Sequence, residues 1–121
     1  MLDDLPAPKL RVYPRYTVVA EKFEAIVSLG MANSRLKDYF DLWVLLSTQA
    51  LDRGVLQEAI TATFARRQTA LPTSTPIGLS PVFGEDPQKI KQWQAFIQKN
   101  QLQAPPLNAV IALLREKLIP Q

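Results

Sequence analysis

The segment from Ser34 to Gln49, SRLKDYFDLWVLLSTQ, restricts the possible folds more than any other part of the chain. At about 100° per residue its apolar side chains cover nearly every direction of a helix. These side chains are Leu36, Tyr39, Phe40, Leu42, Trp43, Val44, Leu45 and Leu46. A helix with this pattern must be buried on several sides. The segment therefore predicts a helix, starting at Asn33 or Ser34, with other elements packed around it.

Four more helical patterns are separated by turn signals. They run from about Thr17, a possible N-cap, to Leu29; from about Asp52 to Arg67; onward from Asp86-Pro87; and from Leu107 to the stop at Pro120. Gly30 follows the first pattern at the position where helices commonly end. A Pro/Thr/Ser-rich loop with a turn at Ser80-Pro81 separates the third and fourth patterns.

The first fourteen residues read as an extended segment, because Pro6, Pro8 and Pro14 disfavour a helix there. Residues 9–13 alternate enough for a short edge strand. We therefore predict an all-α fold of about five helices in one domain, residues 1–121. Its parts are an extended lead-in (1–14), the helices that carry the motifs described below (15–67) and C-terminal helices (81–120).

Composition excludes several kinds of chemistry. The chain has 121 residues, enough to bury roughly two-thirds of its unfolded surface. It contains no cysteine and no histidine, so thiol nucleophiles, disulfides, ordinary zinc sites and imidazole bases are excluded. Any catalysis must use carboxylates, lysine, hydroxyls and a bound cation. The net charge of +3 permits a phosphate-bearing partner without requiring one.

Sequence signals for a membrane or for export are missing. No apolar run reaches the ~18 residues that a membrane helix needs. The first ten residues, MLDDLPAPKL, are acidic and interrupted by proline, unlike a signal or transit peptide. We expect no membrane association and a cytoplasmic location.

Ionisable residues lie on helix faces that the apolar pattern marks as interior. In VVAEKFEAIV, residues 18–27, Lys22 is surrounded in projection by Val18, Val19, Ile26 and Leu29, whereas Glu21, Glu24 and Ser28 share the opposite side. On the next helix Asp38 and Arg35 fall between apolar directions, and Asp41 lies nearer an edge. An isolated charge in a dry interior is strongly unfavourable, so these residues need partners or water.

Three interpretations remain open from this pattern. Arg35 and Asp38 can form an i,i+3 pair while Lys22 extends its ammonium to water. Alternatively, Lys22 and Asp38 form a buried salt bridge with a structural role. In the third, both faces line a polar cleft, with Lys22 directed at a phosphate and Asp38 acting as a base or metal ligand.

Two motifs in these first two predicted helices resemble those of a known family. Ala20-Glu21-Lys22 heads one predicted helix, and Ser-Arg-x-Lys-Asp-x-x-Asp, residues 34–41, heads the next. Together with their surroundings, the two motifs resemble the nucleotidyltransferase AbiEii/AbiGii toxin family over about residues 5–98. The surrounding segments that share the resemblance are residues 13–43, AITATFARR (59–67), Gly78-Leu79-Ser80 and Gln92-Trp93. Its members are toxins of type IV toxin–antitoxin and phage abortive-infection systems.

The resemblance implies metal-dependent transfer of a nucleotide from a nucleoside triphosphate, with tRNA as acceptor in some members. It also implies the helical C-terminal half of a nucleotidyltransferase-like fold. Lys22 then corresponds to the lysine that contacts the triphosphate, with Arg35 and Lys37 as further nucleotide-binding residues. Asp38 and Asp41 correspond to the catalytic carboxylates. Mg²⁺ and a nucleoside triphosphate are the implied cofactors, although we assign no metal ligand in this chain.

The sequence also departs from the family pattern. Family members begin with an α/β half that bears a Gly-Ser loop and two metal-binding aspartates. None of the chain's glycines (Gly30, Gly54, Gly78 and Gly84) is followed by serine, and the adjacent Asp3 and Asp4 would point in different directions along an extended chain. We therefore expect a C-terminal half, as a truncated gene, an expressed fragment or one part of a split protein, that is inactive alone.

Two alternatives belong to other functional classes. The chain can be a non-catalytic interaction module that pairs with itself, with a separate N-terminal half or with a cognate antitoxin, through apolar faces that a missing half would cover. It can also be a helical nucleic-acid binder with phosphate contacts at Arg66 and Arg67. Against the latter, the basic residues are dispersed over several helices.

Overall fold

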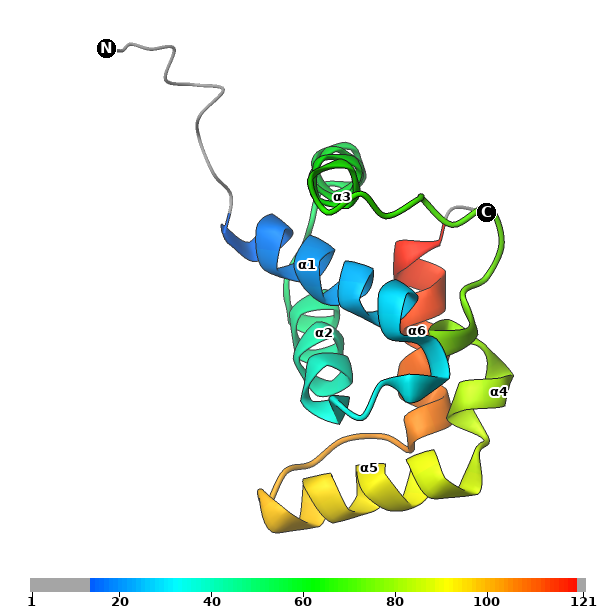
Figure 1. Ribbon diagram of the computed structural model, residues 1–121. Helices are drawn as coiled ribbons and strands as arrows, with labels where there is room; N and C mark the ends of the chain where they lie inside the picture. Colours follow the sequence, from blue (N-terminus) through cyan, green and yellow to red (C-terminus); the bar gives the residue numbers. More distant parts are fainter. Residues whose placement is uncertain (1–13, 120–121) are drawn as a thin grey trace, which may run out of the picture.

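The computed structural model describes residues 14–119, and within this range every regular element is a helix (Figure 1). The all-α prediction is confirmed. The elements are α1 (Pro14–Leu29), η2 (Gly30–Ala32), α2 (Leu36–Thr48), α3 (Arg53–Arg66), η3 (Ile77–Leu79), α4 (Pro81–Gly84), α5 (Pro87–Lys99) and α6 (Leu107–Leu118), where η marks a 3₁₀ helix. No helix within residues 14–119 has both the length and the apolar character needed to cross a membrane.

Local capping chemistry explains the starts of two helices as predicted. The side chain of Asp52 accepts a hydrogen bond from Val55 N at the start of α3. Asp86 caps α5 in the same way, accepting from Lys89 N, with Pro87 at the first helical position. Both aspartates satisfy backbone donors that the first turn of a helix leaves without partners.

Two predicted helix starts were wrong, and one helix was not predicted. Helix α1 begins at Pro14 and not at Thr17, because proline has no N–H to lose at the first helical position. Helix α2 begins at Leu36, since the side chain of Asn33 accepts a hydrogen bond from Arg35 N in a turn before the helix. The turn at Ser80-Pro81 opens a sixth helix, α4, which the sequence did not predict. The predicted strand at 9–13 and the stop at Pro120 lie outside the described residues.

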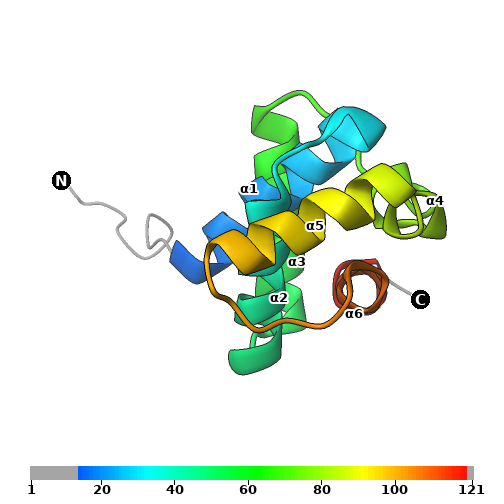
Figure 2. The ribbon, with the colours of Figure 1, turned by 90° about the horizontal axis from the view of Figure 1, so that it is seen from below.

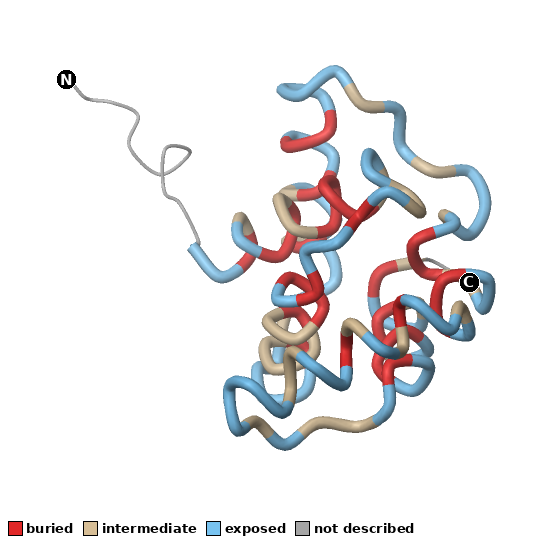
Figure 3. Tube along the Cα trace, turned by 60° about the horizontal axis from the view of Figure 1, so that its bottom comes forward, coloured by how far each residue is buried: buried red, intermediate tan, exposed pale blue. Residues whose placement is uncertain are grey.

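Helix α2 is covered on several sides, as its apolar pattern predicted. It contacts α1, α5 and α6, and α5 crosses it in the view from below (Figures 1 and 2). Helix α1 packs along α3, while η3 and α4 pack against α6. Buried residues follow the inward sides of these helices, and the long loop between α3 and η3 is mostly exposed (Figure 3).

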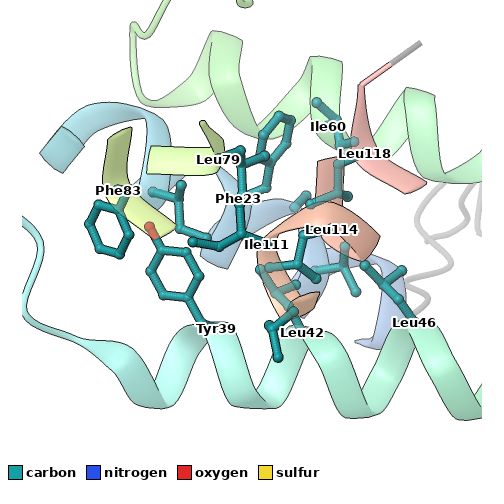
Figure 4. Packing of buried hydrophobic residues seen from close by; sticks show 14 of the residues in the cluster. Phe23, Tyr39, Leu42, Leu46, Ile60, Leu79, Phe83, Ile111, Leu114 and Leu118 are labelled. Atoms are coloured by element: carbon teal, nitrogen blue, oxygen red, sulfur yellow. The ribbon is translucent and has the colours of Figure 1, made fainter. Parts of the chain in front are cut away.

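The core joins α2 to α6 and to the η3–α4 segment (Figure 4). Tyr39 is fully buried; its ring stacks on Phe83 with centroids 5.0 Å apart, and its hydroxyl donates to Gly78 O at 2.8 Å. Other buried members are Phe23, Leu42, Leu46, Ile60, Leu79, Ile111, Leu114 and Leu118. This packing holds α2 beside α1, and that placement brings the candidate residues together.

Candidate functional site

Helix α1 presents Lys22 at the boundary of the core. The neighbouring Val19, Phe23 and Ile26 are buried against other helices, whereas the Lys22 side chain keeps 22% of its surface exposed. The predicted faces of this helix were partly wrong. Val18 and Leu29 are exposed, and Glu24, which we placed on the solvent side, is buried.

Two carboxylates of α2 meet the Lys22 ammonium. Asp38 Oδ1 lies 2.9 Å from Lys22 Nζ, and Asp41 Oδ2 lies 3.2 Å from the same atom. Asp38 is 5% exposed, so this end of the contact is almost fully removed from water. Because the two aspartates are three residues apart on a helix, they share one side and both reach α1.

Two further cations extend the contact along the surface. Arg35 Nε lies 3.3 Å from Asp38 Oδ2, and Lys37 Nζ lies 2.7 Å from Asp41 Oδ2. All five residues singled out from the sequence therefore form one chain of ion pairs, which we call the Lys22 cluster: Lys22, Arg35, Lys37, Asp38 and Asp41. The cluster contains the Arg35–Asp38 i,i+3 pair of the first interpretation above and the Lys22–Asp38 salt bridge of the second.

Exposure differs among the three cations. Arg35 is 63% exposed and Lys37 is 70% exposed, so the expectation that Arg35 lies on an interior surface was wrong. Arg35 precedes the first turn of α2, which frees its side chain from the buried stripe. With three cations and two carboxylates the cluster carries a formal charge of +1, the sign that suits a phosphate-bearing ligand.

Protonation states follow from burial and neighbours. Burial lowers the pKa of Lys22, but hydrogen bonds and charge from Asp38 and Asp41 outweigh it and raise the pKa above the usual value, so Lys22 stays an ammonium. Burial also raises the pKa of Tyr39, and the charge of Asp38 adds to this rise, whereas the neighbouring Asn33 amide opposes it. The Tyr39 phenol therefore stays neutral and is a poor candidate for a base.

The described residues do not fit a metal ion by themselves. Within residues 14–119 no group of three or more His, Cys, Asp or Glu side chains is placed to hold one. Asp38 and Asp41, the two carboxylates of the cluster, are both engaged by Lys22. The cations of the cluster are partly or largely exposed, and such side chains can donate charge-assisted hydrogen bonds to phosphate oxygens.

A second polar cluster, missed by sequence reasoning, joins α1 to the end of α3. Buried Glu24 accepts hydrogen bonds from Thr69 Oγ1 at 2.7 Å, from Ser28 Oγ at 3.1 Å and from Arg67 at 3.1 Å. Arg66 pairs with Glu21 at 3.5 Å. The i,i+4 spacing of Glu24 and Ser28 was the one local signal for this cluster. Both arginines face glutamates of α1, which disfavours the phosphate contacts considered for them above.

A family model described as nucleotidyl transferase AbiEii toxin, type IV toxin–antitoxin system, matches residues 1–116. No curated protein and no solved structure matches the chain significantly. The match spans nearly all of the chain and includes every residue of the Lys22 cluster. The chain therefore belongs to the AbiEii nucleotidyl transferase toxin family of type IV toxin–antitoxin systems.

Proposed function

We propose that the Lys22 cluster is the nucleotide-facing part of a nucleotidyltransferase site, in which Lys22 binds the triphosphate. One observation carries this proposal: Lys22 is held by two carboxylates of a neighbouring helix, yet keeps an exposed fraction through which a ligand can reach it. The exposed part of the side chain leaves the ammonium accessible to a phosphate oxygen as well as to water. Family membership supports nucleotide chemistry for the chain as a whole.

Each basic residue of the cluster has a role that its position allows. An ammonium has three donors, and two carboxylates face that of Lys22, so the remaining donor is available to a phosphate oxygen. Arg35 and Lys37 are exposed enough to turn toward further phosphate oxygens. In phosphoryl transfer, positioning and neutralisation of charge supply most of the catalysis, and these three cations provide both.

The two aspartates act as the catalytic carboxylates. Asp38 is the more buried, and its Oδ2 makes no hydrogen bond of good geometry within residues 14–119, although Arg35 Nε lies 3.3 Å away. This oxygen is the one available to orient or deprotonate an attacking hydroxyl once Arg35 turns toward phosphate. Asp41 holds Lys22 and Lys37 in place. A tRNA hydroxyl is the acceptor that the family resemblance suggests.

Magnesium, implied by the family, would neutralise phosphate charge, but the described residues lack a ligand set for it. We therefore propose that residues outside the described part, such as those of an N-terminal half, supply those ligands. The chain alone is then expected to transfer no nucleotide. Incubation with each labelled nucleoside triphosphate, magnesium and total tRNA, followed by gel analysis, checks this; label in the tRNA above the level without protein would contradict it.

Binding by the chain itself tests the role of Lys22. Calorimetric titration with inorganic triphosphate and with the four nucleoside triphosphates is expected to show binding that Lys22→Met weakens by about tenfold or more, because a charge-assisted hydrogen bond contributes about 1.5–3 kcal/mol. Lys91→Met, at an exposed lysine of α5, is the matched control and should bind like the wild type. Equal weakening by both variants, or no binding by the wild type, would overturn the proposal.

The alternative is a non-catalytic interaction module, favoured by one observation. Several large apolar side chains are exposed, among them Val18 and Leu29 of α1, Ile77 of η3 and Val82 of α4. A cognate antitoxin, a second copy and an N-terminal half are the partners to consider for these side chains. Light scattering separates the cases, since a strict monomer that binds triphosphate would count against the module.

A further inference from the structure

Lys89 of α5 is a buried cation outside the Lys22 cluster. Lys89 is 8% exposed, and within residues 14–119 its ammonium forms no ion pair with a carboxylate. Burial of a charge is unfavourable unless strong contacts compensate it. The contacts of Lys89 therefore indicate why a lysine stands at this position.

Two groups contact the Lys89 ammonium. Nζ donates to the backbone carbonyl of Asn33 at 2.7 Å, and it lies 5.0 Å from the centre of the Phe83 ring, a cation–π distance. Phe83 in turn stacks on Tyr39 of α2. Lys89 thus links α5 and α4 to the short segment between η2 and α2.

Asn33 connects this contact to the Lys22 cluster. Asn33 is fully buried, and its Oδ1 accepts from Arg35 N at 2.8 Å. The Arg35 carbonyl then accepts from Asp38 N at 3.0 Å, within the first turn of α2. An unbroken set of hydrogen bonds therefore runs from Lys89 through Asn33 and Arg35 to the backbone of Asp38.

We propose that Lys89 is a positioning residue that holds the start of α2, so that Asp38 meets Lys22 and Arg35 stands beside it. Lys89 touches neither Lys22 nor Asp38; it acts through the Asn33 carbonyl. Any effect on triphosphate binding rests on the proposed function, whereas the effect on the start of α2 does not. The Asn33 carbonyl requires a donor on a side chain long enough to reach it from α5, and Lys89 provides one.

Amide hydrogen exchange measured by NMR tests the proposal. In Lys89→Met, which keeps the apolar stem and removes the donors, the Arg35 amide is expected to exchange at least about tenfold faster, because loss of one hydrogen bond of about 1.5 kcal/mol frees the segment to open locally. Amides of α3, such as Leu56, should change much less. Lys89→Arg should restore most of the protection, and Lys91→Met should match the wild type.

Two results would overturn the positioning role: unchanged exchange at Arg35 in Lys89→Met, or acceleration that is uniform over all helices. A second measurement needs no variant. In wild-type protein at low denaturant, the amides of Arg35 and Ile90 are expected to open together, since Lys89 joins their segments; independent opening would also overturn it. Triphosphate titration of the same variants is read separately, so loss of the proposed function would leave the exchange result standing.

Discussion

Gly78→Ala is expected to lower the free energy of unfolding by about 2–3 kcal/mol, because the added methyl has no room. A Cβ at Gly78 would lie 2.7 Å from Ile26 Cγ2, 3.0 Å from the Ile26 carbonyl oxygen and 3.1 Å from the Tyr39 hydroxyl. The backbone of α1 cannot yield as a side chain can, and the Tyr39 hydroxyl already donates to the Gly78 carbonyl. The contact between η3, α1 and α2 must therefore open.

Gly54→Ala is the matched control for this substitution. Gly54 is an exposed residue of α3, where an added Cβ would meet only Asp52 Oδ1, at 3.2 Å, within 4 Å. Alanine favours a helix over glycine by roughly 0.5–1 kcal/mol, which offsets some disturbance of the Asp52 cap. We expect its free energy of unfolding to stay within about 1 kcal/mol of wild type. Urea unfolding followed by circular dichroism measures both; similar losses for the two variants would contradict the steric explanation.

Glu24→Gln is expected to destabilise the chain by about 1–2 kcal/mol at pH 7 and to alter its response to acid. Burial raises the pKa of Glu24, but hydrogen bonds from Thr69, Ser28 and Arg67, with the charge of Arg67, outweigh it and lower the pKa below 4.5. A carboxyl whose pKa is lower in the folded state stabilises the fold above its unfolded pKa. That contribution is lost as the pH falls through the folded value.

The difference in stability between wild type and Glu24→Gln should therefore be largest near neutral pH and shrink as the pH falls below about 4.5. Urea unfolding at pH 7, 5, 4 and 3 gives this difference directly. Glu58→Gln, at an exposed position of α3, is the control and should show little difference from wild type at any pH. A constant difference between Glu24→Gln and wild type across this range would show that charge at Glu24 is not what stabilises the α1–α3 contact.

Most helices were predictable from the sequence for local reasons, and so was the unusual position of Lys22 and Asp38, whereas Lys37 was singled out only through the family resemblance. The caps at Asp52 and Asp86 act within four residues of themselves, so their pattern is visible along the chain. The spacing of Asp38 and Asp41 places both on one side of a helix whatever surrounds it. Lys22 could be recognised as misplaced because its neighbours on α1 are apolar.

Other features depended on contacts between residues far apart in the sequence. The burial of Glu24 was missed because its partners Arg67 and Thr69 lie 43 and 45 residues away. Lys89 reads locally as a surface lysine of α5, yet it is buried against Asn33, 56 residues earlier. Helix α4 was missed because four residues are too few to show a helical period.

The sequence by itself determined an all-α chain and the starts of α3 and α5, and it marked Lys22 and Asp38 as ionisable residues among apolar neighbours, because caps and helical periodicity act over one or two turns. Lys37 was singled out only through the family resemblance. Only the tertiary structure decided that α1 lies beside α2, so that one lysine meets two carboxylates, and that α5 holds the start of α2 through Lys89. These placements depend on the packing of Tyr39, Gly78 and Phe83 across separate elements. Such packing is set by how volumes fit in three dimensions, which no local pattern in the chain specifies.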